Sequence, residues 1–582
     1  MFHVYLWLAW AQEHFLVVFL ALAAAVLGGG RLLHITQPLL RALRRLGRRP
    51  ITSVVFVFLL VVGIRLALLP ILGVPVPRVH DEFSYLLAAD TFASGRLSNP
   101  PHPLWVHFET FHVNPLPTYG SMYPPAQGLV LGAFQALTGE AWLGVLLSAA
   151  AMCAAICWML QGWMSGPWAL AGGLLAVSRY STDHYWINSY WGGALPALGG
   201  ALLIGAAPRI VKHARRRDAV IGAIGIAILA NSRPLEGAVL TLLVVLAVAV
   251  ALWRRGASTG LVSMLAPAAL VLVLTGAGMS YYFWRTTGNP LQMPYQVNVE
   301  RYHTVLPWLG SGRLSPMEYR NKEMRTYYTL WAESFWAAPV DSASSFWKLI
   351  RERADYYYQE LVRPWLVVFL AGLAFAAARR NWLALLPFAC FLLPLAAVRW
   401  AHAHYAAPAA GLLIAFLVWG LRALRLWQRD SLLGLRWSNV LLVFAVPALL
   451  LGNIAEIAQA HRNPPPKEPW HLARVRLVHQ LEALPGQHLV LVRYGEPHSV
   501  HAEWVYNRAD IDASRIIWAR EVSPEEDRKL LEYFRQRKVW VLYAEEYPVR
   551  LEPYRTLHSG QSLQEEGSAA IRPSSNTAQA TQ

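Results

Sequence analysis

Residues 141–162 read AWLGVLLSAAAMCAAICWMLQG and contain no charged side chain. As an α-helix, this stretch would extend about 33 Å, which matches the hydrocarbon core of a bilayer. Similar apolar blocks recur along the 582 residues, of which 55% are hydrophobic and only 15% are charged. Soluble proteins carry about a quarter charged residues. The composition therefore excludes a soluble enzyme and a disordered chain, and it predicts a polytopic α-helical membrane protein.

The apolar blocks predict about twelve transmembrane helices. Basic clusters such as Arg209–Arg217 separate the blocks, and we expect these clusters on the cytoplasmic side. That arrangement requires Ala126–Gly139, which would reach only about 21 Å as a helix, to lie in the outer interface without crossing. The predicted spans are residues 12–30, 51–73, 141–162, 167–181, 191–207, 218–232, 236–252, 261–283, 364–378, 381–398, 405–421 and 438–456.

This topology divides the chain into four parts. Residues 1–50 form an additional N-terminal transmembrane helix with a basic cytoplasmic loop, and residues 51–458 form a membrane module with long outer loops at 74–140 and 284–362. Short apolar runs alternate with amphipathic segments after a Pro-rich linker, which predicts a small extracytoplasmic α/β domain at 467–558. The Ser/Gln/Thr-rich end, 559–582, is typical of disorder. We expect strands at Gln487–Tyr494, Arg515–Ala519 and Lys538–Ala544, and helices at Trp470–Leu484 and Pro524–Arg537.

The net charge of +16 comes from 51 Lys and Arg against 35 Asp and Glu. Most of these arginines lie between apolar blocks, where they face anionic lipid headgroups, so the charge indicates membrane topology and no nucleic-acid partner. All three cysteines fall inside apolar segments, which favours packing over disulfides or a cysteine metal site.

Candidate chemistry begins directly after a predicted span, at His80-Asp81-Glu82. An acid at a helix start often only caps the helix and complements its dipole. The functional alternative is a general base at the membrane surface. A free Asp has a pKa of about 3.9 and is a weak base. A general base at this position therefore needs a higher pKa, and we expect desolvation and the neighbouring Glu82 to raise the pKa of Asp81.

Four motifs in order resemble the GT-C glycosyltransferase superfamily, over roughly residues 50–420. The stretch looks like the protein O-mannosyltransferases and lipid A aminoarabinose transferases, which take a sugar from a polyprenyl phosphate. The motifs are Asp81-Glu82 followed by Tyr85, Ala88 and Gly95; Tyr123-Pro124-Pro125; Arg233-Pro234-Leu235-Glu236-Gly237; and His404-Tyr405-Ala406-Ala407-Pro408.

The resemblance implies an inverting sugar transfer. Together with the topology above, which leaves the active site and the C-terminal domain outside the cytoplasm, it predicts a protein of the inner (plasma) membrane whose active site and C-terminal domain face the periplasm. Asp81 would be the general base, and Glu82 would act with it or position a substrate. The implied partners are a polyprenyl-phosphate-linked sugar, an extracytoplasmic glycan, lipid or protein acceptor, and membrane lipids. No cofactor is required in this scheme, although some family members use a divalent ion.

A phosphate leaving group needs positive charge, and the planar guanidinium of arginine binds phosphate well. Three arginines are expected at the outer boundary: Arg65, Arg233 and Arg399. Each has a simpler alternative, which is snorkelling for Arg65, a local ion pair for Arg233 and an interfacial anchor for Arg399.

Aromatic and hydrogen-bonding residues provide the candidate substrate-binding groups. An interfacial aromatic belt uses the same residue types and is the alternative. Asp183 is the nearest match to a second carboxylate that the family often supplies. The candidates are Tyr85, Tyr123, Asp183, Asn188, Tyr190, Trp191, His402, His404 and Tyr405.

A cluster of His102, His107 and Glu109, with His112 nearby, is the candidate for a divalent metal site. A solvated loop is the alternative for this Pro- and His-rich stretch. Asp510-Ile511-Asp512 resembles the Asp-x-Asp motif of nucleotide-sugar transferases, but a tail outside the cytoplasm cannot meet their substrates.

Two rival functions remain at this stage. A transporter or flippase for a lipid-linked or small solute would use Asp81, Glu82 and the arginines as gating charges, although no inverted repeat is evident. A non-catalytic scaffold that displays the tail domain leaves Asp81-Glu82 unexplained.

Overall fold

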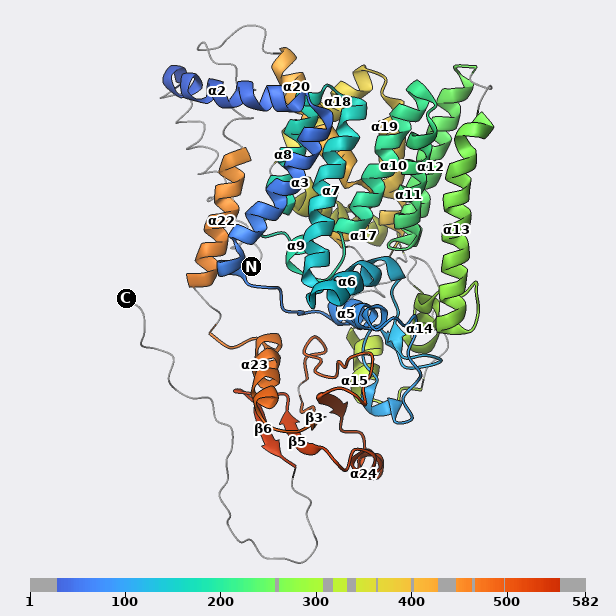
Figure 1. Ribbon diagram of the computed structural model, residues 1–582, viewed down its shortest axis with the longest axis vertical. Helices are drawn as coiled ribbons and strands as arrows, with labels where there is room; N and C mark the ends of the chain where they lie inside the picture. The colour runs from blue at the N-terminus through green and yellow to red at the C-terminus, as the bar shows by residue number, and fades with distance from the viewer. Residues whose placement is uncertain are drawn as a thin grey trace, which may run out of the picture.

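The computed structural model describes residues 29–256, 261–306, 318–331, 342–362, 365–398, 402–427, 446–462, 466–496 and 498–554. The described helices form a bundle with a smaller, sheet-containing body at one end (Figure 1). Most of the predicted first span (residues 12–28), the predicted disordered end (559–582) and Arg399 lie outside the described residues.

The bundle contains α2 (Gly29–Gly47), α3 (Pro50–Ala67), α4 (Leu69–Leu72), α7 (Trp142–Trp163), α8 (Gly166–Tyr180), α10 (Ala194–His213), α11 (Arg216–Ala230), α12 (Pro234–Trp253), α13 (Leu261–Thr287), α18 (Leu366–Ala378), α19 (Trp382–Ala397), α20 (Ala410–Trp427) and α22 (Val446–Arg462). Shorter elements connect or cover it: α5 (His80–Ala93), η1 (Trp105–Phe108), β1 (Val113–Asn114), β2 (Gly120–Ser121), α6 (Pro125–Thr138), α9 (Tyr185–Asn188), α14 (Pro294–Tyr302), α15 (Lys322–Arg325), η2 (Thr326–Trp331), α17 (Ala343–Tyr357), η3 (Tyr358–Val362), η4 (Ala403–Tyr405) and η5 (Ala407–Ala409).

Six of the described helices are long and apolar enough to cross a membrane: α3, α7, α10, α12, α13 and α20. The segment from α17 to α18, bent by 94° at its break, is a further candidate. The predicted blocks at 167–181, 218–232 and 381–398 form α8, α11 and α19, which have only 15, 15 and 16 residues. By length and composition, the described residues thus hold six candidate spans, or up to seven. The lengths of the apolar blocks predict about twelve for the whole chain.

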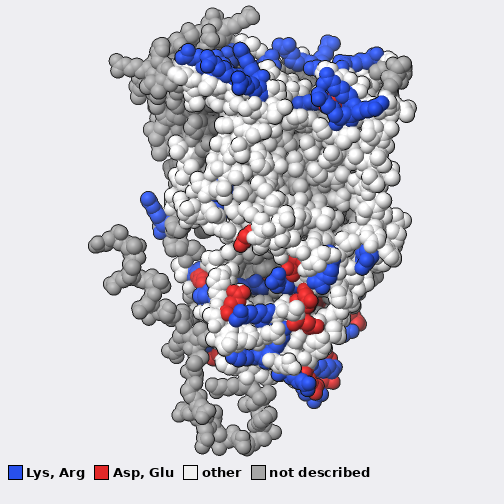
Figure 2. Space-filling view, viewed as in Figure 1, with Lys and Arg blue, Asp and Glu red and all other residues white. Residues whose placement is uncertain are grey.

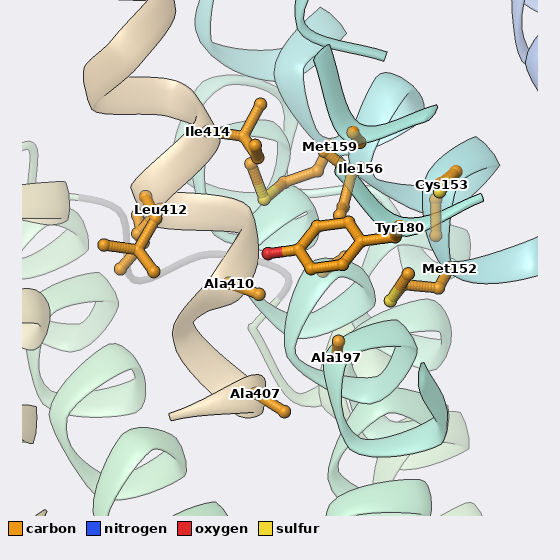
Figure 3. Packing of buried hydrophobic residues seen from close by; sticks show 14 of the residues in the cluster. Met152, Cys153, Ile156, Met159, Tyr180, Ala197, Ala407, Ala410, Leu412 and Ile414 are labelled. Carbon is orange, nitrogen blue, oxygen red and sulfur yellow. The ribbon is translucent and has the colours of Figure 1, made fainter. Parts of the chain in front are cut away.

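The centre of the bundle is built from small and apolar side chains. Met152, Cys153 and Ile156 of α7 pack near Tyr180 of α8 and Ala410 of α20 (Figure 3). These side chains are nearly or fully buried, whereas α3, α12 and α13 expose large apolar side chains to the outside. Contact with water is unfavourable for exposed leucine and valine side chains, so these peripheral helices are suited to contact lipid.

Lys and Arg side chains gather at one end of the bundle, the end that also carries α2 (Figures 1 and 2). The middle of the molecule is almost free of charge in this view, and at the opposite end acidic side chains are mixed with basic ones (Figure 2). This distribution matches the predicted arrangement of basic clusters on a single side of the membrane.

The helices α5 and α6 lie across the end of the bundle away from the basic side (Figure 1). With 14 residues, α6 is too short to count as a span, as predicted for Ala126–Gly139. Gly128 and Gly132 let α6 approach α5 closely, since a Cβ at these positions would lie 2.6 Å from Ala88 Cβ and 2.7 Å from the Ala89 carbonyl oxygen. This packing fixes α5 against the bundle.

The C-terminal part has the strands and helices that the sequence predicts, with one further strand. Its elements are α23 (Trp470–Ala483), β3 (His488–Arg493), β4 (Ile516–Arg520), α24 (Pro524–Tyr533), β5 (Lys538–Tyr543) and β6 (Arg550–Pro553). The sheet order is β4-β3-β5-β6, with β3 parallel to both neighbours and β6 antiparallel to β5. Leu489 and Ile517 of this sheet share one apolar cluster with Leu87 and Phe108, so the sheet packs directly on the first outer loop.

Candidate active site

The Asp81 carboxylate lies in the first turn of α5 and is held by two side chains from one hairpin. The Tyr123 hydroxyl donates a hydrogen bond to Asp81 Oδ1, and His112 Nδ1 lies 3.6 Å from Oδ2. The Tyr123 hydroxyl also lies 3.1 Å from His112 Nδ1. The pairing of β1 with β2 explains this arrangement, because His112 directly precedes β1 and Tyr123 follows β2.

Asp81 is ionised in this environment. Burial opposes ionisation, but the His112 ring and the hydrogen bond from Tyr123 outweigh it and lower the pKa of Asp81 well below its ordinary value. The prediction that the pKa of Asp81 is raised is therefore wrong. The neighbouring acid does not change this, because Glu82 faces elsewhere.

Glu82 is almost fully buried and fastens the start of α5 to a loop of the bundle. Its two oxygens accept the backbone N–H groups of Arg78, at 3.0 Å, and Tyr190, at 2.9 Å. Burial raises the pKa of Glu82, while these two hydrogen bonds oppose the rise. The geometry therefore shows Glu82 and the Tyr190 backbone holding α5 in place.

Arg233, directly before α12, supplies a cation that acts on some of the same side chains as Asp81. Its guanidinium lies over the Tyr405 ring, 4.4 Å from the ring centroid. Tyr85 stacks on Tyr123 at 4.5 Å, and its pKa is raised by burial and by Asp81 while Arg233 lowers it. Both charges thus act on Tyr85. The four sequence motifs, which contain Asp81, Tyr123, Arg233 and Tyr405, therefore lie around one site.

Arg65 is also buried, but its guanidinium is engaged away from Asp81. Nε donates to Asn188 Oδ1 at 2.9 Å, Nη2 donates to the Gly73 carbonyl at 2.8 Å, and the group lies 4.7 Å from the Trp142 ring centroid. Its remaining nitrogen, Nη1, is buried without a hydrogen-bond partner among the described residues. Arg399, the third predicted phosphate ligand, lies outside the described residues.

The remaining aromatic candidates form a layer next to Arg233. Trp191 packs against His402 and His404 at 5.2 and 4.7 Å, and His404 Nδ1 is 3.1 Å from the hydroxyl of Tyr185. Burial lowers the pKa of His402, Asp81 opposes this and Arg233 adds to it, so both charges also reach this ring. Asp183 is exposed and accepts a hydrogen bond from Thr182.

The three candidate metal ligands point to different partners. His102 Nε2 lies 3.1 Å from Asp512, His107 Nδ1 lies 2.9 Å from the Arg520 carbonyl, and Glu109 accepts from Tyr302 and Asn321. The described ranges contain no group of three His, Cys, Asp or Glu side chains arranged to hold a metal ion. These residues instead join the first outer loop to other parts of the chain.

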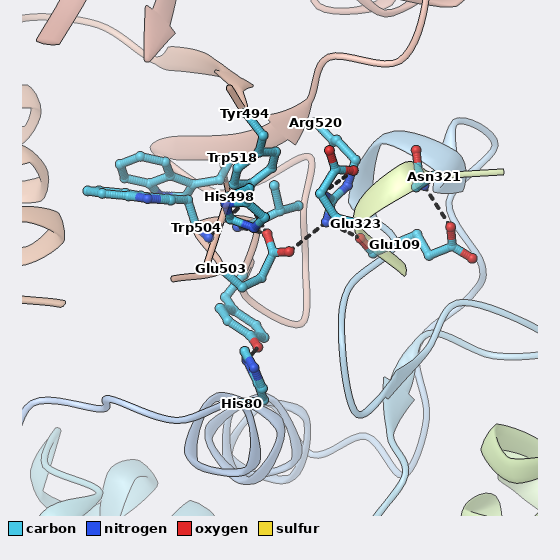
Figure 4. Close-up of polar contacts among 12 residues, drawn as sticks. His80, Glu109, Asn321, Glu323, Tyr494, His498, Glu503, Trp504, Trp518 and Arg520 are labelled. Atoms are coloured by element: carbon cyan, nitrogen blue, oxygen red, sulfur yellow. Dashed lines mark hydrogen bonds and ion pairs between the residues drawn. The ribbon is translucent and has the colours of Figure 1, made fainter. Parts of the chain in front are cut away.

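Arg520 forms the centre of this junction (Figure 4). Its guanidinium, only 1% exposed, donates to Glu503 at 2.7 Å and to Glu323 at 2.9 Å, and it also reaches the Glu109 carbonyl. The two carboxylates and the backbone carbonyl come from the C-terminal part, the second outer loop and the first outer loop, respectively. One buried cation thus ties the three segments together.

Sequence reasoning did not assign four of the side chains beside Asp81 to the site. His112 and His80 lie on the first outer loop, while Tyr327 and Tyr506 come from the second loop and the C-terminal part. The Tyr327 hydroxyl lies 3.1 Å from His112 Nε2, and the Tyr506 hydroxyl lies 2.7 Å from His80 Nδ1. His112 was within the histidine-rich stretch, but no local pattern joins Tyr327 or Tyr506 to it.

The chain is similar to solved structures of the oligosaccharyltransferase AglB from the archaeon Archaeoglobus fulgidus. The complex with Zn and sulfate gives a TM-score of 0.48 at 12% identity, and the match covers 84% of this chain and 67% of that one. Oligosaccharyltransferases are GT-C enzymes.

Two further AglB structures show the same level of similarity. The form tethered to an acceptor peptide with the NVT sequon has a TM-score of 0.44 at 12% identity, covering 85% of this chain and 68% of that one. The complex with an inhibitory peptide and a dolichol-phosphate has a TM-score of 0.44 at 11% identity, covering 84% and 69%. No family profile and no curated protein sequence matches the chain.

Proposed function

We propose that this protein is an inverting glycosyltransferase that moves a sugar from a polyprenyl-phosphate donor to an extracytoplasmic acceptor. The observation that carries the proposal is the Asp81 carboxylate, ionised and held between Tyr123 and His112. It lies at the end of an apolar bundle, where a lipid-borne substrate and a water-borne acceptor can meet. The four motifs that resemble GT-C enzymes converge on the same place.

In the proposed step, Asp81 accepts the proton of an acceptor hydroxyl as that oxygen attacks the anomeric carbon. The new carbon–oxygen bond forms on the face opposite the phosphate, and the bond from the anomeric carbon to the phosphate oxygen breaks. The polyprenyl phosphate leaves with that electron pair. Since an ionised Asp81 is a weak base, proton transfer would come late, when the attacking oxygen has become acidic.

Arg233 is the proposed ligand for the leaving phosphate. Burial opposes a charge here, but Glu236 and the surrounding tyrosines raise the pKa of Arg233, so the guanidinium stays charged. A planar guanidinium binds two phosphate oxygens at once and stabilises the charge that develops as the sugar leaves. Arg399 remains a second proposed ligand, and Arg65 is better placed to hold the loop that contains Asn188.

Sidedness follows from the same proposal. The basic end of the bundle would face the cytoplasm, so Asp81 and the C-terminal sheet would lie in the periplasm or its equivalent. The aromatic layer of Tyr185, Trp191, His402 and Tyr405 would then border the donor headgroup. The acceptor would enter between the outer loops.

The test compares envelope glycolipids and glycoproteins by mass spectrometry in cells that carry wild-type protein, Asp81→Asn or Asp510→Asn. The first change removes the base, whereas Asp510 is exposed and only accepts a hydrogen bond from the Ala513 amide. We expect one glycan product to disappear with Asp81→Asn and to persist with Asp510→Asn. A product that survives in Asp81→Asn contradicts the proposal. If no glycan differs and a solute fails to cross the membrane instead, the protein is a transporter.

A further inference from the structure

A cavity of about 370 Å³ lies between α5 and the C-terminal part of the chain. Phe83 and Leu86 of α5, with Pro77 just before that helix, form an apolar wall. Arg474 and Val478 of α23 also line the cavity, from the C-terminal part. Figure 1 shows α5 between the bundle and this part, and Figure 2 shows a hollow at their junction with basic and acidic side chains around it. The cavity therefore combines an apolar wall with charged groups.

Arg474 brings a positive charge to this cavity and forms no ion pair with a carboxylate among the described residues. Its Nε and Nη2 donate to the backbone carbonyls of Trp504 and Tyr506, at 3.4 and 2.8 Å. The acid that acts on it electrostatically is Glu503, which is bonded instead to Arg520 at 2.7 Å. The Arg474 guanidinium is thus oriented by neutral carbonyl groups, and its charge is not neutralised by a direct partner.

The Arg474 guanidinium is also partly removed from water. It lies 5.2 Å from the ring centroid of Phe83 and 4.9 Å from that of Trp518. Burial lowers the pKa of Arg474 to about 10, so the group keeps its proton at pH 7 but is less well solvated than an exposed arginine. A bound anion would offset this loss of solvation. The surroundings of Arg474 therefore favour an anionic ligand.

The other charged residues that line the cavity are paired or lie farther along it. Asp90 accepts hydrogen bonds from Arg508 and from the Ala509 amide, both at 2.8 Å. Arg515 is exposed and donates to the backbone carbonyl of Glu482 at 2.6 Å. On α23, Glu482 follows the first arginine of the cavity by about two helical turns, or about 12 Å. An anion would therefore bind at the opposite end, beside the uncompensated guanidinium.

The position of the cavity in the molecule indicates that the anion belongs to a lipid. The helix α5 lies across the end of the bundle away from the basic side (Figure 1). The headgroup region extends about 5–8 Å beyond the hydrocarbon core of a bilayer, and a helix is about 10 Å across. A cavity beside a helix at this surface is therefore at the depth of the lipid phosphates. The apolar wall suits the glycerol backbone and the first acyl carbons, and the guanidinium suits the phosphate.

We propose that this cavity binds the headgroup of an anionic phospholipid from the leaflet on the α5 side, with Arg474 as the ligand of its phosphate. This site is separate from the one around Asp81 and does not depend on the proposed function. The bound lipid contacts both α5 and α23, and it thereby joins the C-terminal part of the chain to the membrane surface.

Native mass spectrometry of the full-length protein in a mild detergent measures this binding directly. The probe is phosphatidylglycerol, which is added at increasing concentration to the wild-type protein, Arg474→Gln and Arg474→Lys. We expect the wild-type protein to bind phosphatidylglycerol at least about tenfold more tightly than Arg474→Gln, because a hydrogen bond to a charged group is lost. Arg474→Lys keeps the charge without the planar guanidinium, so its affinity should be intermediate.

Arg476→Gln is the matched control for this measurement. Arg476 lies on the same helix but pairs with Glu468 at 2.9 Å and does not line the cavity, so its variant should bind the lipid as the wild-type protein does. Val478→Trp keeps Arg474 and fills the cavity, so it should lose binding too, and it keeps the test decisive if Arg474→Gln does not fold. Equal affinity in the wild-type protein and in Val478→Trp overturns the proposal.

The source of the phosphate is decided by two competing probes. Inorganic phosphate in excess should leave phosphatidylglycerol bound, and displacement would overturn the assignment to a lipid by showing a site for soluble anions. Phosphatidylcholine, whose headgroup has no net charge, should bind about tenfold more weakly. Equal binding of the two lipids would overturn the role of the Arg474 charge.

The location is separated from the proposed donor site by Arg233→Gln. Arg233 does not line this cavity, so phosphatidylglycerol should bind this variant and the wild-type protein equally well. Loss of the lipid in Arg233→Gln would place it at the donor site and overturn the proposal. Transfer by Asp81→Asn decides the proposed function independently, because binding of phosphatidylglycerol is read without any assay of transfer.

Discussion

The hydroxyl of Tyr123 donates a hydrogen bond to Oδ1 of Asp81, across a gap of 42 residues in the sequence. Together with His112, this bond keeps the carboxylate ionised and oriented before any substrate binds. An acceptor hydroxyl that approaches Asp81 would have to share or replace the bond from Tyr123. The tyrosine therefore controls both the charge of the proposed base and access to it.

Replacing Tyr123 by Phe should raise the pKa of Asp81, because the hydrogen bond that favours the ionised form is lost. In the wild-type protein the lowered pKa of Asp81 means that activity should not fall on the acid side until well below the ordinary aspartate pKa of about 3.9. In Tyr123→Phe the acid limb of the kcat/KM profile should move to higher pH. The measurement is the pH dependence of sugar transfer in liposomes.

Tyr119→Phe is the matched control for this experiment. Tyr119 lies in the same hairpin region, but its hydroxyl donates to the Asn507 carbonyl and not to Asp81. Its pH profile should follow that of the wild-type protein. If the acid limb stays in place in Tyr123→Phe, the hydrogen bond does not set the charge of Asp81.

Some of this site could be predicted from local sequence. Asp81 follows an apolar block and starts an amphipathic stretch, so its position at the end of a span could be predicted. The choice between Asp81 and Glu82 was not, because it depends on a hairpin with two residues per strand, too short for any alternation to be seen. The lowered pKa of Asp81 was missed for the same reason, since it is caused by His112 and Tyr123.

Contacts between distant segments were out of reach of sequence patterns. His80 and Tyr506 are 426 residues apart, and nothing in the periodicity of either segment indicates the other. The strands β3, β4 and β5 were predicted because each is an apolar run. The strand β6 was missed because Arg550–Pro553 has a single buried residue, Leu551, and relies on pairing with β5.

Replacing Arg233 by Gln should weaken binding of the donor phosphate. The loss of a charged hydrogen-bond donor to phosphate should reduce affinity by about ten- to a hundredfold. The measurement is binding of polyprenyl phosphate to protein in nanodiscs. Arg255→Gln is the control, because Arg255 is exposed and donates to the Val211 carbonyl. Equal affinities in both variants would exclude Arg233 as the phosphate ligand.

Replacing Glu82 by Gln should destabilise the start of α5. The glutamine keeps one oxygen, but its amide group would face a backbone N–H of Arg78 or Tyr190 and leave it unpaired. The cost is about 1–3 kcal/mol for a buried unsatisfied donor. The apparent melting temperature should fall, and binding of polyprenyl phosphate should persist in the folded fraction. A variant with unchanged stability but no transfer would instead assign Glu82 to catalysis.

Replacing Arg520 by Gln should loosen the C-terminal part from both outer loops. The change leaves Glu503, which is fully buried, without its cation, and breaking a buried pair costs about 3–5 kcal/mol. Limited proteolysis should cut the outer loops faster than in the wild-type protein. Arg493→Gln removes an exposed ion pair with Glu521 and should cost no more than about 1 kcal/mol. Identical cutting rates in the two variants would mean that Arg520 does not couple the segments.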